Sequence, residues 1–420
     1  MPSCATRRHR ATVLAQTFQL IAWAWLAHAA RAEGEKLAPE IQLFRDATDS
    51  IVNRCVYQPR EPAVISGALR ALESRLRPAF AEYFPNSIPP EEDIAAVYIG
   101  TLRKIAESDE ARSAGLTLKA LVERSIDGYC RTLDAYSEYA DEETARRIHE
   151  ANNPDYVGIG ITFRRMREGF YCVPFPGGTA HLAGVLRDDE LLEIDGENVR
   201  AMTLLEISAR LSGRAGTTVR LKTKHKEGST DVFEIAREPV VSTPVTFEEG
   251  DGFVKIGFRR INERACDDLR QLLRSLGNGR ALILDFRGCP GGEFSAAIRI
   301  AELFLPEKTV IAKVETTAGR EPELSRNRAP YRASALRLLQ DELTASGAEL
   351  IIAALISHRD LVKAESRGEK TYGKGVATRP IKLEGGGILK ITDSRVFGPQ
   401  DEYWDGEGLV PSSEAKPLAP

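Results

Sequence analysis

The spacing of apolar residues along the chain changes twice, which predicts three regions. From about Pro39 to Ala151, apolar positions recur at intervals of three and four residues, as they do in amphipathic helices. The clearest of these runs are 40–55, 91–107 and 117–133, and prolines punctuate the joins. This pattern predicts an N-terminal helical region over residues 33–151.

The second region is rich in short strands. It begins after the turn-forming sequence NNPD at 152–155 and continues, with one or two helices, to about Pro239. Its length is that of a small module. We therefore predict a separate β-rich module over residues 155–239.

In the third region strands alternate with helices. Strands are expected at 252–258, 281–286, 309–316, 376–383 and 387–396, and helices near 262–276, near 294–304 and after Ser346. Such alternation predicts a sheet covered by helices. The third region is placed at 244–415, and the expected fold class is a multidomain α/β protein.

The first 32 residues have the pattern of a secretory signal peptide. Arginines at 7, 8 and 10 precede the apolar run Ile21–Ala30, and Ala30-Arg31-Ala32 forms a small-residue cleavage site before Glu33. The alternative is an uncleaved membrane anchor, but the run is shorter than the roughly 20 apolar residues that span a bilayer. We expect an exported, periplasmic protein, with membrane association only if this segment stays attached.

Composition and charge exclude several classes of protein. The chain has 420 residues, 42% of them hydrophobic and 28% charged, which excludes collagen, coiled coil and wholesale disorder. Residues 1–32 hold four arginines and no acid, so the rest of the chain carries 53 basic and 61 acidic residues. Without a basic excess, general nucleic-acid binding is not expected. The sequence carries no signal for an oligomeric state.

The cysteines do not form a recognisable framework. Five follow the predicted signal peptide, at positions 55, 130, 172, 266 and 289, and no CxxC pair occurs. An odd number at wide spacing predicts buried free thiols. Cys55 and Cys130 both lie in predicted helices and could pair in an oxidising compartment, which spacing alone does not decide.

Several familiar catalytic patterns are absent, so neither a metal nor a cofactor is expected. There is no HExxH and no GxSxG, the histidines stand apart from one another, and the acidic run Asp188–Glu190 is interpreted as a solvated turn. The stretch Gly368–Lys374 fits the GxxxxGK part of a phosphate-binding loop. However, the next residue is Gly375 and lacks the hydroxyl that would hold magnesium, so nucleotide binding is not expected.

A small-residue cluster, Leu343–Glu349, stands at the start of a predicted helix. A hydroxyl there lies beside the positive end of the helix and its free amides, which suits a nucleophile whose adduct becomes an oxyanion. The alternative is that Thr344 or Ser346 only caps the helix. The residues by themselves leave both interpretations open.

Four segments, in this order, resemble the C-terminal processing (tail-specific) serine peptidases that carry a PDZ domain. They are LDAYSEY at 133–139, LILDFRGCPGG at 282–292, TASGAE at 344–349 and GEKTYGKG at 368–375, with a PDZ-like unit between the first two. The resemblance covers roughly Leu133 to Pro411. It implies an N-terminal helical region, an inserted PDZ-like module and a C-terminal peptidase core.

The resemblance also implies a Ser/Lys dyad, in which Ser346 is the nucleophile and Lys374 the general base. A lysine near its reference pKa of about 10.4 is protonated at neutral pH, so the amine must be desolvated to act as a base. Lys370, four residues earlier, is the competing candidate, and a solvent-facing position is the more usual one for such a lysine. The family position selects Lys374.

An oxyanion hole is implied by the same resemblance. Its two backbone donors would be Gly291 or Gly292, after the buried strand, and Gly347, directly after the nucleophile. A plain strand-to-helix turn at Pro290-Gly291-Gly292 is the alternative, and both interpretations can hold together.

Two features depart from the family pattern. The stretch between Ser346 and Lys374 is slightly longer than usual, with the extra residues placed near 358–367. The family often has a glutamine four residues after the lysine to orient it, and here that residue is Thr378, whose hydroxyl reaches less far. The alternative to a peptidase is therefore a catalytically impaired, PDZ-containing peptide-binding scaffold of the same fold.

The PDZ-like module is expected to bind peptide. Val157, Gly158, Ile159, Gly160 and Ile161 resemble a carboxylate-binding loop, whose amides hold a C-terminus while the following strand pairs with the peptide. The helix near 204–211 would form the other wall, and an Asp-Gly turn at 195–196 agrees with the family. The expected partners are proteins or peptides with accessible C-termini.

Overall fold

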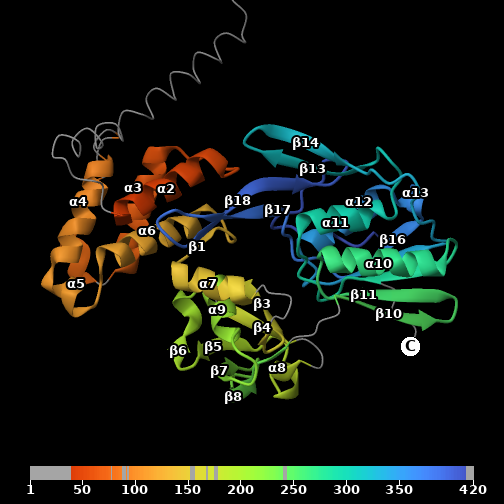
Figure 1. Cartoon of the computed structure of the whole chain (residues 1–420), viewed down its shortest axis with the longest axis horizontal. Coiled ribbons are helices and arrows are strands. Elements are labelled where there is room, and N and C mark those ends of the chain that lie inside the picture. Colours follow the sequence, from red (N-terminus) through yellow and green to blue (C-terminus); the bar gives the residue numbers. More distant parts are fainter. Residues whose placement is uncertain are drawn as a thin grey trace, which may run out of the picture. The chain divides into compact units, whose positions relative to one another are not determined.

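The computed structural model describes residues 39–412, apart from residues 77, 88–90, 92–93, 152–156, 167–168, 175–177 and 240–243 (Figure 1). The predicted signal peptide and the NNPD turn lie outside the described residues. The chain divides into two units: one takes in the chain up to Arg146 with Thr378–Thr392, and the other takes in Arg147–Ala377 and the chain from Asp393. No helix in the described part is both long and apolar enough to cross a bilayer.

The first unit is mainly helical. The three runs with helical spacing form α2 (Pro39–Arg54), α4 (Ile94–Glu107) and α6 (Leu118–Leu133). The other elements of this unit are α3 (Glu61–Arg75), η1 (Pro78–Tyr83), α5 (Asp109–Ser113) and the first half of α7 (Glu142–Ala151). The helix α6 begins at the N-cap Thr117, whose hydroxyl accepts a bond of 3.2 Å from the Ala120 amide. Its buried residues recur at helical spacing and pack on α3 and α2.

A strand from the far end of the sequence completes this unit. The short strand β1 (Glu138–Ala140) pairs antiparallel with the start of β18 (Ile388–Phe397), Glu138 opposite Lys390, and the Lys390 amine lies 2.9 Å from the Glu138 carboxylate. The preceding strand, β17 (Val376–Lys382), also pairs with β18. Leu389 and Ile391 are fully buried in the same apolar core as the helices.

Within the second unit, residues 157–239 form the predicted β-rich module. Its strands are β2 (Val157–Gly158), β3 (Ile161–Met166), β4 (Gly169–Pro174), β5 (Glu190–Ile194), β6 (Glu197–Asn198), β7 (Thr218–Lys224), β8 (Thr230–Ala236) and β9 (Glu238–Pro239). The helices are α8 (Thr179–Leu182), η2 (Val199–Ala201) and α9 (Leu204–Leu211). The main sheet has the order β3-β4-β5-β7-β8, with β6 paired to β5. Asp195 and Gly196 both have positive φ, which forms the tight β5–β6 turn.

The acidic run in this module is not a solvated turn, as the sequence had suggested. Asp189 is only 2% exposed, and its carboxylate lies 2.7 Å from Nδ1 of His225. The other ring nitrogen, Nε2, lies 2.9 Å from the Asp231 carboxylate. His225 therefore does not stand alone: it links the segment before β5 to the β7–β8 hairpin. A pair separated by 36 positions gives no local sequence signal.

We expect the cluster of His225 with Asp189 and Asp231 to make the protein less stable as the pH becomes alkaline. The bonds to Asp231 and Asp189 raise the pKa of His225 to about 9. Because that pKa lies above the unfolded value of about 6.5, the contribution to stability is complete below about pH 6.5 and is lost as the pH rises through about 9. The midpoint temperature of thermal unfolding should fall more steeply between pH 7 and pH 10 for the wild type than for His225→Gln. A ring titration by NMR with a midpoint near 6.5 would contradict this.

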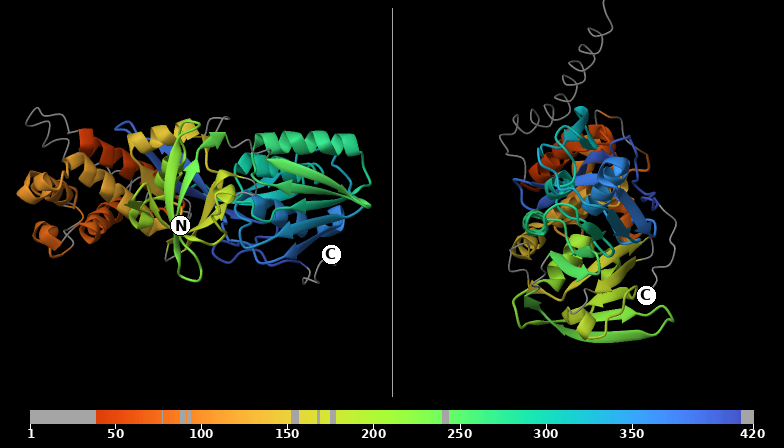
Figure 2. Two further views of the ribbon diagram at one scale, coloured as in Figure 1. Left: turned by 90° about the horizontal axis from the view of Figure 1, so that it is seen from below. Right: turned by 90° about the vertical axis from the view of Figure 1, so that its right-hand side faces the viewer.

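The rest of the second unit is an α/β layer. Its main strands are β10 (Val245–Gly250), β11 (Phe253–Phe258), β12 (Ala281–Asp285), β15 (Leu336–Gln340) and β16 (Ala364–Gly368). The helices are α10 (Glu263–Leu276), α11 (Phe294–Glu302), α12 (Gly347–Ser357) and α13 (Arg359–Val362). The antiparallel pair β13 (Val310–Thr316) and β14 (Gly319–Leu324) belongs to the sheet that contains β18. In the left view of Figure 2 the bright green helix α10 lies along one face of the main sheet.

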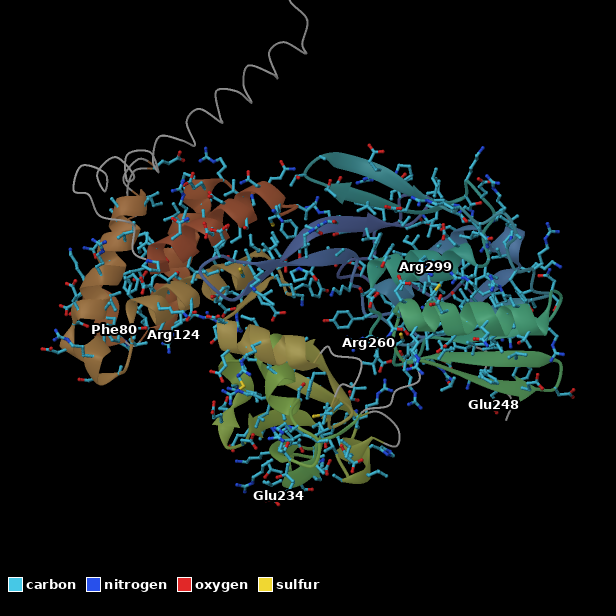
Figure 3. All side chains as sticks on the ribbon, in the orientation of Figure 1. Phe80, Arg124, Glu234, Glu248, Arg260 and Arg299 are labelled. Atoms are coloured by element: carbon cyan, nitrogen blue, oxygen red, sulfur yellow. The ribbon has the colours of Figure 1, made fainter. Side chains whose placement is uncertain are left out.

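Exposed acids occupy the outer strands of these sheets. Glu234 on β8 and Glu248 on β10 are solvent-exposed, and Figure 3 shows both side chains pointing outward. Charge on an edge strand discourages pairing with another chain. The five cysteines at 55, 130, 172, 266 and 289 are buried and free, as predicted.

The direction of the strands locates the candidate site. In the order β10-β11-β12-β15-β16, the last four strands are parallel to one another. Their carboxyl ends therefore lie at one edge of the sheet, where ligands bind in open α/β sheets. The loops that leave this edge carry the glycines after β12, the serine cluster after β15 and the lysine segment after β16.

Candidate active site

Ser346 is the N-cap residue of α12, with φ 55° and ψ −119°. A positive φ in a residue other than glycine costs roughly 1–3 kcal/mol and persists only where the surroundings impose it. The surroundings here are close: the Ala345 amide donates to the Cys289 carbonyl at 3.0 Å, and residues 347–355 of α12 are all buried. The backbone thus presents Ser346 at a helix N-terminus in a strained turn, an arrangement common at functional sites.

The two glycines after β12 lie against this turn. A Cβ built on Gly291, which has φ 83°, would collide with the Ala345 carbonyl oxygen and lie 2.9 Å from the Ser346 Cβ. It would also lie 2.8 Å from the Gly347 nitrogen. A Cβ on Gly292 would collide with the Ile261 carbonyl. The structure therefore brings Gly291 and Gly347 beside Ser346, where no larger residue fits at position 291.

A buried carboxylate joins the serine turn to the lysine loop. Glu349 is 0% exposed, and its Oε2 accepts bonds from the amides of Ser346 at 2.7 Å and of Lys374 at 2.8 Å. Its Oε1 accepts from the Gly373 amide at 2.7 Å and from the Thr371 hydroxyl at 2.5 Å. The backbones of Ser346 and Lys374 therefore converge on one oxygen atom.

Glu349 was not identified as a site residue from the sequence. Burial raises the pKa of its carboxyl above the ordinary value, while the bonds from Thr371, Lys374, Gly373 and Ser346 act in the opposite direction. The signal that could have found it is the spacing S-x-x-E, because a Glu at N3 of a helix reaches back to the N-cap amide.

Thr344 does not cap the helix, one of the alternatives that the sequence left open. Its hydroxyl donates to the Phe286 carbonyl at 2.9 Å and accepts from the Asp341 amide at 2.9 Å. Thr344 thus ties the segment after β15 to the end of β12, two residues before Ser346.

The remaining lysine-loop residues are placed as follows. Lys370 is 53% exposed at its side chain and lies 3.8 Å from the Glu407 carboxylate, so it faces solvent as expected. The GxxxxGK stretch continues into strand β17 rather than into the helix that a phosphate-binding loop requires. Thr378 is half-buried within β17, and the slightly longer stretch before β16 contains the short helix α13.

The predicted carboxylate-binding loop lies between β2 and β3. Val157 and Gly158 form β2, Ile159 is fully buried, Gly160 has φ 67°, and Ile161 begins β3. The Ile159 carbonyl accepts a bond of 2.8 Å from the Ala180 amide. The helix predicted near 204–211 is α9, which has a capping box formed by Thr203 and Glu206.

Among the described residues, no group of three or more His, Cys, Asp or Glu side chains is placed to hold a metal ion. Ser346 carries a hydroxyl, Lys374 carries an amine, and the backbone around them carries amides. These can perform nucleophilic attack, proton transfer and oxyanion binding.

Two family models match the chain. Residues 252–415 match peptidase family S41, and residues 172–224 match a PDZ domain. These matches confirm the resemblance carried by the motifs after β12, after β15 and after β16.

Relatives of the chain include proteins described as "Probable CtpA-like serine protease". The one from Staphylococcus haemolyticus (strain JCSC1435) is 26% identical over 300 residues, which are 70% of this chain and 60% of the relative. The one from Staphylococcus aureus (strain COL) is 28% identical over 300 residues, which are 69% of this chain and 59% of the relative. The chain thus spans less than two thirds of the length of these curated relatives.

The solved structure of the photosystem II D1 C-terminal processing protease has the same fold. It matches with a TM-score of 0.67 at 18% identity, covering 90% of this chain and 94% of that chain. At this identity the likeness concerns the fold alone. It confirms the predicted fold class: a helical N-terminal region, a PDZ-like module and a C-terminal α/β peptidase-type core.

Proposed function

We propose that the protein is a serine endopeptidase in which Ser346 is the nucleophile and Lys374 the general base. The observation that carries the proposal is the convergence of both backbones on the Glu349 carboxylate, with Gly291 and Gly347 beside the serine. The match of residues 252–415 to the model of peptidase family S41 supports the reaction class.

The proposed reaction follows acyl-enzyme chemistry. The Ser346 hydroxyl oxygen attacks the peptide carbonyl carbon while the Lys374 amine accepts the proton of the hydroxyl. The amides of Gly291 or Gly292 and of Gly347 bind the tetrahedral oxyanion. The C–N bond then breaks, the lysine delivers the proton to the leaving amine, and water hydrolyses the ester by the reverse proton transfers.

The substrate and compartment are part of the same proposal. The loop 157–161 would bind the C-terminal carboxylate of an unstructured protein or peptide end, with β3 pairing to its backbone. The export pattern of residues 1–32 supports action in the periplasm after cleavage. Sequencing the N-terminus of the purified mature protein tests this: it should begin at Glu33.

A fluorophosphonate probe tests the nucleophile directly. Such a probe forms a covalent adduct with an activated serine, and mass spectrometry should locate it on the peptide that contains Ser346. We expect the Ser346→Ala variant to remain unlabelled while still binding a C-terminal peptide. Labelling of a different serine, with cleavage unchanged in Ser346→Ala, would contradict the proposal.

A peptide-binding scaffold without peptidase activity is the second candidate. The observation in its favour is Thr378, which stands where the family often has a glutamine that orients the lysine. The same probe separates the two candidates: a scaffold would capture C-terminal peptides, neither cleave them nor react with the probe, and show no difference between wild type and Ser346→Ala.

A further inference from the structure

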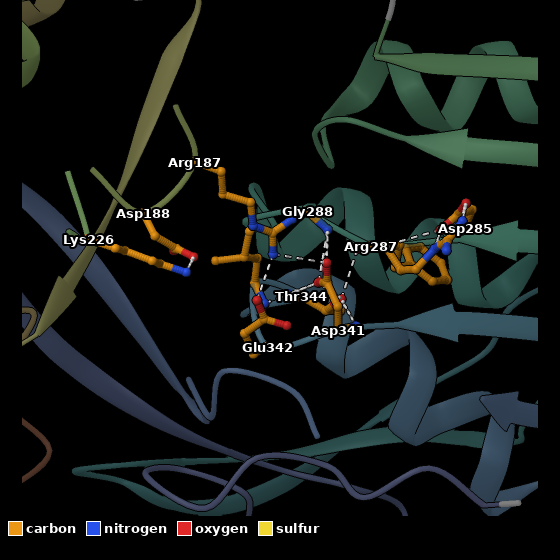
Figure 4. Close-up of polar contacts among 11 residues, drawn as sticks. Arg187, Asp188, Lys226, Asp285, Arg287, Gly288, Asp341, Glu342 and Thr344 are labelled. Atoms are coloured by element: carbon orange, nitrogen blue, oxygen red, sulfur yellow. Dashed lines mark hydrogen bonds and ion pairs between the residues drawn. The ribbon is translucent and has the colours of Figure 1, made fainter. Parts of the chain in front are cut away.

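One carboxylate outside the proposed dyad holds the two segments that flank the oxyanion hole. Asp341 follows β15, and both of its carboxylate oxygens accept from the Gly288 amide, at 2.9 and 3.0 Å (Figure 4). Its Oδ1 also accepts from the amides of Leu343 at 3.1 Å and Thr344 at 3.0 Å, and from the Thr344 hydroxyl at 3.1 Å. The side chain is 13% exposed, so water competes little for these oxygens.

These donors belong to the two loops that must be in register for catalysis. Gly288 leads through Pro290 to Gly291, and Thr344 leads to Ser346. The position of the Gly291 amide relative to Ser346 therefore depends on how the two loops are held together. A misplacement of about 1 Å at a reacting centre can reduce the rate by about 10²-fold.

An arginine from the PDZ-like module completes this arrangement. The Arg187 guanidinium lies 2.6 Å from the Glu342 carboxylate and 3.7 Å from that of Asp341. The next residue, Asp188, pairs with Lys226 at 2.9 Å, which links the Arg187 segment to the β7–β8 hairpin. Figure 4 shows Arg187 pointing toward both acids, with the Lys226–Asp188 pair on its other side.

We propose that Asp341 is a positioning residue for the proposed hydrolysis and that Arg187 orients its carboxylate. Asp341 holds the loop after β12 against the serine turn, and the positive charge of Arg187, 3.7 Å away, directs that carboxylate at its amide donors. This inference rests on the proposed function, but its geometric part can be tested without any catalysis.

The first test replaces Asp341 by asparagine. Asn keeps the size of the side chain but turns an amide donor toward amide donors. We expect kcat for a short peptide to fall by about 10²-fold, KM to change by less than about 3-fold, and binding of a C-terminal peptide to the PDZ-like module to stay the same. Hydrogen exchange should become faster in the segments 286–292 and 341–348 and stay unchanged in α10.

The second test replaces Arg187, an exposed residue whose loss leaves the core intact. We expect Arg187→Gln to lower kcat by about 5-fold and to speed exchange in the same two segments, and Arg187→Lys to restore most of both. Arg270→Gln is the matched control, because Arg270 forms a comparable surface pair with Asp267 at 2.7 Å. It should change neither quantity.

The outcomes separate this inference from the proposed function. If the wild type cleaves peptides but Asp341→Asn retains its kcat, the inference is wrong and the peptidase stands. If neither the wild type nor any variant cleaves peptides, but hydrogen exchange in the variants rises in both segments, the positioning role stands and the peptidase proposal fails. Unchanged exchange in both the Asp341 and the Arg187 variants would overturn the inference in either case.

Discussion

Lys374→Ala should lower kcat for a peptide with a free C-terminus by about four to six orders of magnitude, the loss seen when a nucleophile or its base is removed. Without the amine, no group in the proposed dyad can accept the serine proton. Ser346→Ala should lose as much, and the double variant no more, because residues that act as one unit are not additive. KM and peptide binding should change little, since neither side chain forms the carboxylate-binding loop.

Two further lysine variants sharpen this test. Lys374→Arg should be as inactive as Lys374→Ala, because a guanidinium stays protonated in proteins. Lys370→Ala should keep its rate within about 2-fold, because Lys370 is exposed and forms only a surface ion pair with Glu407. In a steady-state assay with a quenched fluorescent peptide, a full rate in Lys374→Ala would refute the dyad.

The second large effect is expected for Glu349→Gln. The carboxylate accepts four bonds, from the Ser346, Lys374 and Gly373 amides and the Thr371 hydroxyl. The amide group of Gln would turn donors toward donors, and each buried group left unpaired costs about 1–3 kcal/mol. We expect kcat to fall by about 10²–10³-fold, because the serine turn and the lysine loop would no longer share one anchor.

The matched control and a pH profile complete this experiment. Glu365→Gln, on strand β16, alters a carboxylate paired with Arg337 at 2.7 Å and should leave kcat unchanged.

Burial raises the pKa of Glu349, so folding favours the protonated carboxyl. Glu349 therefore contributes to stability below the pKa that it has in the unfolded chain, and this contribution is lost as the pH rises through its higher pKa in the folded state. Activity should show the opposite trend and fall on acidification, since protonation removes an acceptor. Activity that stays constant as Glu349 becomes protonated would contradict the anchoring role.

The parts of the fold that the sequence predicted well are those with a clear local period. α6 and α10 bury one stripe each, and β12 is a short apolar run, so spacing alone located them. β14 was missed because its residues are polar and mostly exposed, and the short buried strand β15 was not predicted either. β1 was missed because it has three residues and gains its pairing only from β18, which lies some 250 positions later.

The candidate site also has one part that the sequence identified and another that it did not. Ser346, Lys374, Gly291 and Gly347 were identified by a family resemblance, and their closeness follows from parallel strands that end at one edge. The hydrogen bonds that join the loops could not be predicted from the sequence. The bonds of Glu349 to the lysine loop and of Asp341 to Gly288 join segments far apart in sequence, and acidic residues of this kind occur on any protein surface.

The return of residues 378–392 to the helical unit has a consequence for biosynthesis. Leu383, Leu389 and Ile391 complete the core of helices that lie far upstream in the sequence, so that core stays open until residues 383–391 have been synthesised. A contact of such high sequence separation also slows spontaneous folding. During synthesis, the helices α2 to α6 therefore present an unfinished apolar surface, which a chaperone would have to shield until β18 is in place.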